Sequence, residues 1–126
     1  MLAVDVAAGK VTRRLQLTDP RAATIADDLW VTFADGLAQV DPVTLEVAAV
    51  YEVDLGLDGE IWADSHDVWA RASGREMLTH LDPRQHRFLE TLTSPTYRSA
   101  GDVLVVGDSL WTTASDDGVL LRVRPR

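Results

Sequence analysis

The stretch Asp28-Leu29-Trp30-Val31-Thr32 reveals an internal repeat, because tripeptides similar to its first three residues occur twice more along the chain. The tripeptides are Asp28-Leu29-Trp30, Asp67-Val68-Trp69 and Ser109-Leu110-Trp111, and the pairs Asp41-Pro42, Asp82-Pro83 and Arg124-Pro125 follow at the same interval. A repeat of roughly 40 residues made only of short strands is typical of one propeller blade per unit. We therefore predict an all-β chain, a β-propeller with about three four-stranded blades.

Two complete units are predicted, at 21–57 and 58–101. Each has four short runs of β-branched, aromatic or alternating apolar residues, separated by turn residues such as Asp35-Gly36. The expected strands of the first complete unit are 22–26, 29–33, 37–40 and 46–53. Those of the second are 60–63, 68–72, 77–81 and 87–91.

The two ends of the chain each carry part of a unit. Residues 102–126 contain the first three strands, at 103–106, 110–113 and 119–123, and residues 1–20 match the third and fourth strands, at 2–6 and 11–17. About three blades are too few for a closed ring of four to eight, and such an arc leaves two apolar blade faces open. We expect a homodimer that closes a six-bladed ring. The alternatives are a piece of a longer propeller and an arc that docks on another protein.

The strand count fits this ring imperfectly. Half of a six-bladed ring, with four strands in each blade, needs twelve strands. The chain is predicted to have thirteen, because the third strand of one blade is present twice. One copy of that strand must therefore be displaced or redundant.

Composition narrows the classes of partner. Of 126 residues, 20 are acidic and 12 are basic, so the net charge of −8 argues against nucleic acid and anionic membranes. The chain has no cysteine, which excludes disulfides and thiolate chemistry. Residues 1–9 lack the basic start and long apolar run of a signal peptide or membrane anchor, so the cytoplasm is the default location and the sequence does not name the compartment.

The phrases Leu29-Trp30-Val31-Thr32, Ala34-Asp35-Gly36, Val40-Asp41-Pro42 and Glu46-Val47 resemble a bacterial propeller repeat. That repeat is similar to those of the YVTN and streptogramin-lyase-like propellers, and the resemblance spans almost the whole chain. It implies the fold and leaves the function open, because these families include binding proteins, surface proteins, quinoprotein subunits and a few enzymes. No position matches the metal-assisted, histidine-containing site of the lyases.

The aromatic and histidine residues mostly suit structural roles. Trp30, Trp69 and Trp111 share one position in the unit and are expected to fill the space between blades. Trp62 lies in a first strand, at a position that we equate with Ile25 and about Val106, and is a candidate ligand contact near the ring axis. The three histidines are scattered over different segments, with His80 at a position of solvated or blade-edge type, and no catalytic residue is predicted.

The loops hold the remaining candidates. The turn between the second and third strands and the connection between units are expected on one face of the ring, around the axial channel. Asp35, Asp102 and Asp116 are candidate metal ligands there, for a divalent cation such as calcium, although aspartate also favours turns for its own hydrogen bonds. Candidate ligand-binding residues on this face are Tyr97 and Arg98, in the longest irregular segment, together with Asp58 and Glu60.

From these features we expect a non-catalytic binding or scaffolding module, with a protein or small molecule bound at the loop face. The alternative is an enzyme, a divalent-metal-dependent lyase or hydrolase with its site at the channel mouth. The sequence names neither ligand nor reaction.

Overall fold

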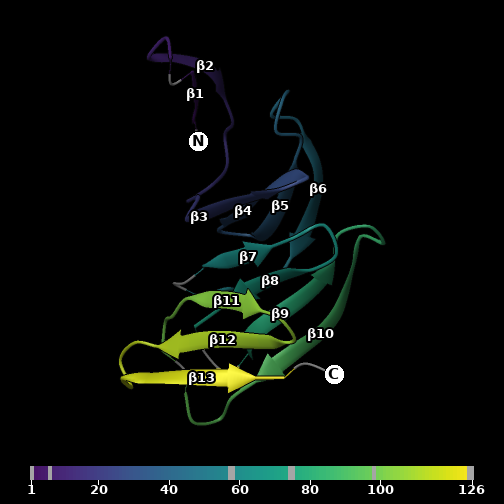
Figure 1. The fold of residues 1–126 in the computed structure, drawn as a ribbon. Coiled ribbons are helices and arrows are strands. Elements are labelled where there is room, and N and C mark those ends of the chain that lie inside the picture. Colours follow the sequence, from purple (N-terminus) through teal and green to yellow (C-terminus); the bar gives the residue numbers. More distant parts are fainter. Residues whose placement is uncertain (1, 6, 57–58, 74–75, 98, 125–126) are drawn as a thin grey trace.

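The structure, a computed structural model, describes residues 2–5, 7–56, 59–73, 76–97 and 99–124. These residues form thirteen strands and their connections, and the all-β prediction is confirmed (Figure 1). In the described part of the chain, no helix is long and apolar enough to cross a membrane. The strands are β1 (Leu2–Asp5), β2 (Lys10–Arg14), β3 (Ala22–Ala26), β4 (Asp28–Phe33), β5 (Gly36–Val40), β6 (Val47–Glu52), β7 (Ile61–Ala63), β8 (Val68–Arg71), β9 (Glu76–Asp82), β10 (Arg87–Thr93), β11 (Val103–Val106), β12 (Ser109–Ala114) and β13 (Val119–Val123).

The strands form three antiparallel sheets in chain order and one separate hairpin. Sheet I is β3-β4-β5-β6, sheet II is β7-β8-β9-β10, sheet III is β11-β12-β13, and β1 pairs only with β2. All thirteen strands lie where the sequence pattern predicts them, with ends that differ by a few residues at most. Sheet III has no fourth strand in the described chain, so one edge of β13 is unpaired.

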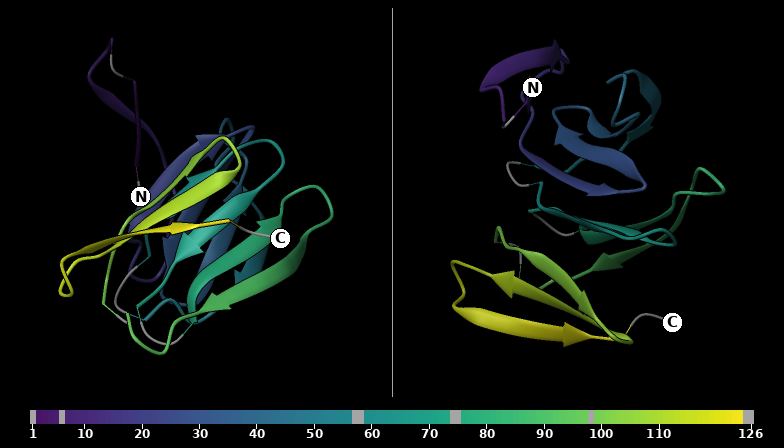
Figure 2. Two further views of the ribbon diagram at one scale, coloured as in Figure 1. Left: turned by 60° about the horizontal axis from the view of Figure 1, so that its bottom comes forward. Right: turned by 45° about the horizontal axis from the view of Figure 1, so that its top comes forward.

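The three sheets stack face to face, with sheet II between the other two (Figure 2). One core cluster lies between sheets I and II and contains Trp30, Leu37 and Val68. A second lies between sheets II and III and contains Trp69, Leu78 and Leu110. The sheets approach one another mainly along their first strands, because β7 contacts both β3 and β11.

The sequence predicts that all three repeated tryptophans fill the spaces between sheets, and two of them do so. Trp30 is fully buried and Trp69 is 3% exposed, whereas Trp111, on the outer face of sheet III, is half-buried. Each tryptophan lies opposite a polar residue of the third strand; the pairs are Trp30–Gln39, Trp69–His80 and Trp111–Arg122. The expectation of a solvated position for His80 is wrong, because this side chain is only 12% exposed and lies against Trp69.

The register corrects the position assigned to Trp62. Trp62 pairs with Trp69 and so shares the position of Thr24 and Leu104, which pair with the other two tryptophans. Ile25 and Val106 are not its equivalents. Ile25 lies one residue further along its strand, and neighbouring residues of a strand point to opposite faces of the sheet.

The hairpin β1–β2 stands away from the sheets in Figure 1, and the segment after it returns to sheet I. Leu15 is buried against Val31 and Phe33, on the outer face of that sheet. This contact covers only part of the face, because Ile25, Val47 and Val50 remain exposed. The outer face of sheet III carries exposed Leu104, Val106 and Leu120. Both end sheets therefore present apolar side chains to solvent.

Candidate functional site

One face of the stack gathers the turns between second and third strands and the connections that enter each sheet; we call it the loop face. Backbone hydrogen bonds tie each turn to the connection beside it. The amide of Ala34 donates to the carbonyl of Thr18 (2.9 Å), that of Ser73 to Leu55 (3.3 Å) and that of Ser115 to Ala100 (2.8 Å). The predicted placement of these segments on one face is confirmed.

A depression of about 470 Å³ lies on the loop face between sheets II and III. Glu60 and Asp102 line it together with Thr113 and Ser115. Its backbone is closely packed, because a Cβ atom at Gly101 would come within 1.8 Å of the Thr113 carbonyl oxygen. The structure thus brings together two acidic residues that the sequence assigned to different roles, one to a ligand and one to a metal ion.

Arg71, at the end of β8, holds the wall of this depression in place. Its guanidinium group is fully buried and spans from sheet II to sheet III. The Nε atom donates to the Thr112 hydroxyl (2.8 Å), and one terminal nitrogen donates to the carbonyls of Ser99 (2.8 Å) and Thr113 (2.9 Å). A planar guanidinium with several donors suits such a set of carbonyls. The β10–β11 connection is thereby held at Ser99 beside sheet III.

Sequence reasoning missed Arg71, although the repeat contains the signal. Two residues after the repeated tryptophan, the other units carry Thr32 and Thr113. An arginine in place of a repeated threonine marks a position that does something different in its own unit.

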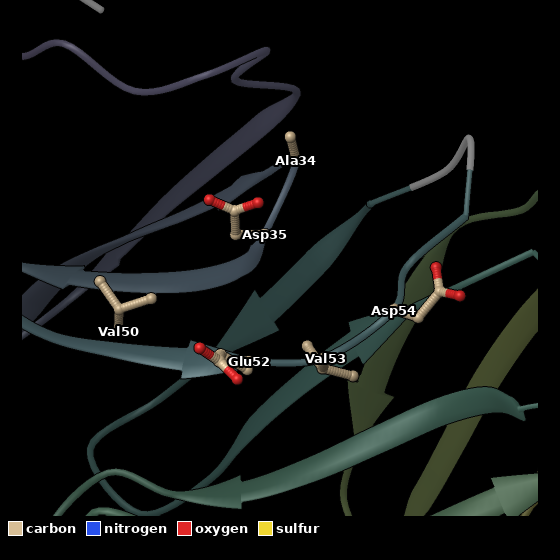
Figure 3. A pocket seen from close by; sticks show the side chains of 6 residues that line it. All are labelled: Ala34, Asp35, Val50, Glu52, Val53 and Asp54. Atoms are coloured by element: carbon tan, nitrogen blue, oxygen red, sulfur yellow. The ribbon is translucent and has the colours of Figure 1, made fainter.

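A second acidic depression, of about 550 Å³, is broad and open (Figure 3). Its carboxylates come from three segments: Asp35 from the β4–β5 turn, Glu52 from the end of β6 and Asp54 from the connection that follows. Asp54 accepts a hydrogen bond from the amide of Gly56 (2.9 Å), a local turn contact.

The three candidate metal ligands do not form a common site within this chain. Asp35 lines the broad depression, Asp102 lines the one between sheets II and III, and Asp116 is exposed in the β12–β13 turn. In the ranges that the structure describes, no three His, Asp or Glu side chains are grouped so that they could hold a metal ion.

The remaining candidate ligand contacts have varied places. Tyr97 is half-buried in the β10–β11 connection, and its amide donates to the buried Ser94 hydroxyl (2.9 Å). Trp62 is half-buried and packs against the core between sheets II and III. Asp58 and Arg98 lie outside the described residues.

At the opposite end of the same sheets, His80 lies in a smaller cavity of about 240 Å³. Its Nε2 atom is 2.6 Å from Asp67 Oδ1, and its Nδ1 atom is 3.3 Å from Glu90 Oε1. The imidazole ring stacks on Trp69, with ring centroids 3.9 Å apart. The cavity is also lined by Asp108 and Ser109 of sheet III.

His86 joins sheet II to sheet I. Its Nδ1 atom is 2.8 Å from the Tyr51 hydroxyl, which donates to Gln39 Oε1 (2.7 Å), and Gln39 in turn donates to Asp28 (2.6 Å). Burial, and secondarily the Asp28 carboxylate, raise the pKa of Tyr51 above the usual tyrosine value. The contacts of both histidines are with protein groups that hold strands and sheets together.

Compared with known proteins, the chain matches no family model, no curated protein and no solved structure.

Proposed function

We propose that the three sheets are blades of a β-propeller and that two copies of the chain close a six-bladed ring. Three features support the blade assignment. The first strands lie nearest one another, the units share one strand order, and the repeated tryptophans Trp30 and Trp69 pack against the following sheet. In propellers, sheets that radiate from a central channel are in contact in the same way.

The hairpin β1–β2 supports the assignment of the missing strands. It has the geometry of the hairpins between third and fourth strands: Gly9, Leu45 and His86, at the same position of the three turns, have φ angles of 65°, 59° and 53°. In each hairpin the strand register also shifts by one residue soon after the turn, at equivalent positions of the three fourth strands. By this geometry β2 is a fourth strand, the one that sheet III lacks.

In the closed ring, β2 of one copy lies beside β13 of the other. The strands β1 and β13 both have the position of a third strand, so only one of them can occupy it. We assign it to β13, because Leu121 and Val123 pack against the core between sheets II and III and all five of its residues pair with β12. The strand β1, which pairs only with β2, is then displaced from β2 in the ring.

We propose that the ring is a non-catalytic binding module and that its ligand carries a positive charge. The observation that carries this proposal is the depression whose lining combines the acidic residues Glu60 and Asp102 with Thr113 and Ser115. Carboxylates and hydroxyls accept hydrogen bonds from an ammonium or guanidinium group, and the net charge of −8 attracts a cation from a distance.

The backbone around the depression favours binding because it is fixed before the ligand arrives. Arg71 and the amide of Ser115 hold the β10–β11 connection against sheet III at the carbonyls of Ser99 and Ala100. A preorganised site loses less conformational freedom on binding than a loop that must first be ordered. The backbone of the proposed site is therefore held by these hydrogen bonds before the ligand binds.

The test measures fluorescence anisotropy with three labelled peptides of equal length, one basic, one neutral and one acidic. We expect saturable binding of the basic peptide alone, weakened at least about tenfold in the double variant Glu60→Gln/Asp102→Asn, because charged hydrogen bonds contribute about 1.5–3 kcal/mol each. Glu46→Gln, at an exposed residue in the β5–β6 turn, is the matched control. Equal binding of all three peptides, or an equal effect of the control, would overturn the proposal.

Calcium separates this function from a metal-dependent reaction. A metal ion that binds the folded ring raises its unfolding temperature by mass action. We expect no shift in the melting temperature with millimolar calcium or magnesium, and a shift abolished by Asp102→Asn would favour a metal site instead.

A further inference from the structure

Two residues on the outer face of sheet III repeat a buried pair of the other sheets. Leu37 and Leu78 lie at the same position of their units as Leu120, which follows from the pairing of each third strand with its second strand. Leu37 and Leu78 are fully buried against the following sheet, whereas Leu120 is 61% exposed. Likewise, Trp111 has the same position in its unit as Trp30 and Trp69, which are buried, but it is only half-buried. The outer face of sheet III therefore has the side chains of an intersheet contact without the next sheet.

The side chains that cover the equivalent positions are known from the two contacts inside the chain. Between sheets I and II, the cluster that contains Trp30 and Leu37 includes Val68 and Ala63 of sheet II. Between sheets II and III, the cluster with Trp69 and Leu78 includes Leu110 and Val105 of sheet III. In both cases the cover comes from a cross-strand pair of the first and second strands.

Sheet I carries the same cross-strand pair on its outer face. Ile25 pairs with Leu29 as Ala63 pairs with Val68 and Val105 with Leu110. In the described part of the chain only the separate hairpin β1–β2 precedes sheet I, and Ile25 is 65% exposed. The chain thus presents the two halves of one contact on its two opposite ends.

We infer that Trp111 and Leu120 of one copy pack against Ile25 and Leu29 of a second copy, and that the same contact forms a second time with the roles exchanged. The inference rests on the proposed two-copy ring and names the residues that close it. A second copy is the occupant that the observations favour, because each face matches the partner of its own repeat and a two-fold arrangement uses both faces of both chains.

The proposed contact between copies is apolar, like the contacts between sheets inside the chain. Leu29, Ile25 and Leu120 are aliphatic, and Trp111 adds a large ring whose only described ring contact is the Arg122 guanidinium, 5.6 Å from its centroid. A buried aromatic anchor with aliphatic neighbours is the usual composition of an interface centre. An unpaired charge placed there must lose its water without gaining a partner.

The experiment is sedimentation equilibrium of the full chain and of three single variants. Leu120→Glu and Ile25→Glu place a carboxylate on one or the other face. Val43→Glu places it at a 76% exposed valine in the β5–β6 turn and is the matched control. Because all three positions are largely exposed within one chain, each variant is expected to fold, and circular dichroism checks this.

We expect a mass of twice 13.8 kDa for the natural chain and for Val43→Glu. For Leu120→Glu and Ile25→Glu we expect a dimer dissociation constant raised about 100-fold or more. The double variant Leu120→Lys/Ile25→Glu places opposite charges across the contact, and it should regain at least about tenfold of the affinity that Ile25→Glu loses.

The outcomes separate the inference from the ring on which it rests. A natural chain that stays monomeric at about 100 µM, which corresponds to a free energy of association weaker than about −5.5 kcal/mol, would overturn both. A dimer that neither charge substitution weakens would overturn the named contact and leave the two-copy ring intact. Weakening by both without rescue by the double variant would show that the two residues do not meet.

Discussion

Trp69 lies flat on His80 across β8 and β9, with ring centroids 3.9 Å apart and an angle of 10° between the ring planes. Both side chains belong to sheet II and face sheet III, and Asp67 and Glu90 lie at the two ring nitrogens of His80. The stack is therefore one unit of apolar contact and hydrogen bonding at the centre of the chain.

Removal of the indole ring should be costly. Trp69→Ala is expected to lower the free energy of unfolding by about 3–5 kcal/mol, because the ring is 3% exposed and the neighbouring sheets cannot close the resulting cavity. His80→Gln is the control, since Gln39 already makes the corresponding contact with Asp28 in sheet I. Urea unfolding measures both. A loss below about 1 kcal/mol for Trp69→Ala would contradict the placement of the ring between sheets.

Arg71 should determine the order of the β10–β11 connection. In Arg71→Met, the carbonyls of Ser99 and Thr113 lose their guanidinium donor, at a cost of about 1–3 kcal/mol for each group left unsatisfied. We expect faster amide hydrogen exchange at 99–101 and little change in sheet I. Arg71→Lys keeps the charge without the planar fork and should recover only part of the protection. Unchanged exchange in both variants would show that the connection is ordered by other contacts.

Tyr51 should make the stability depend on pH in alkaline solution. Its pKa in the folded chain is raised, so the unfolded chain loses the phenolic proton first, from about pH 10. The contribution to stability is fully present below that pH and is lost as the pH rises toward the folded pKa. The natural chain should exceed Tyr51→Phe in stability by about 1 kcal/mol at pH 8, and this advantage should shrink above pH 10.

Thermal unfolding at pH 8, 10 and 11 tests this dependence. Tyr97→Phe removes the other tyrosine and isolates the phenolate absorbance of Tyr51. An advantage over Tyr51→Phe that is independent of pH would contradict a buried, hydrogen-bonded phenol.

Arg13 should report which third strand remains in the ring. Arg13 has the position of Ala49 and Glu90, which lie opposite Gln39 and His80, so beside β13 it would lie opposite Arg122. Like charges directly opposite destabilise a pair of strands. Arg13→Glu should therefore tighten the dimer several-fold at low salt, whereas Arg14→Glu, opposite Leu121, should not. If β1 keeps its place, Arg13 stays opposite Ala3 and the substitution has no such effect.

The sequence predicted the strands well because their pattern is local. The alternation of apolar residues, the turn pair Asp35-Gly36 and the pairs Asp41-Pro42 and Asp82-Pro83 at the ends of the third strands act within a few residues. The repeat also placed Trp30 and Trp69 correctly, since a position used in every unit answers the same packing need.

The prediction was wrong where a shift of one residue in strand register changes the sheet face on which a side chain lies. The sequence pattern predicts that Trp62 is equivalent to Ile25, but in the structure it pairs with Trp69 and is therefore equivalent to Thr24. In a three-residue strand the sequence pattern cannot locate the register, and a slip of one residue reverses the side that a residue faces.

The number, order and approximate bounds of the strands follow from the amino-acid pattern alone, because the free energies that select a strand and its turns come from neighbouring residues. The loop residues that meet, in contrast, are known from the packing of the sheets in space. Glu60 and Asp102 share a depression, Asp35 and Asp116 lie apart from it, and Arg71 bridges two sheets, because those relations depend on how separate sheets stack. Contacts between residues 40 positions apart are set by the packing of whole faces, and the local pattern does not encode them.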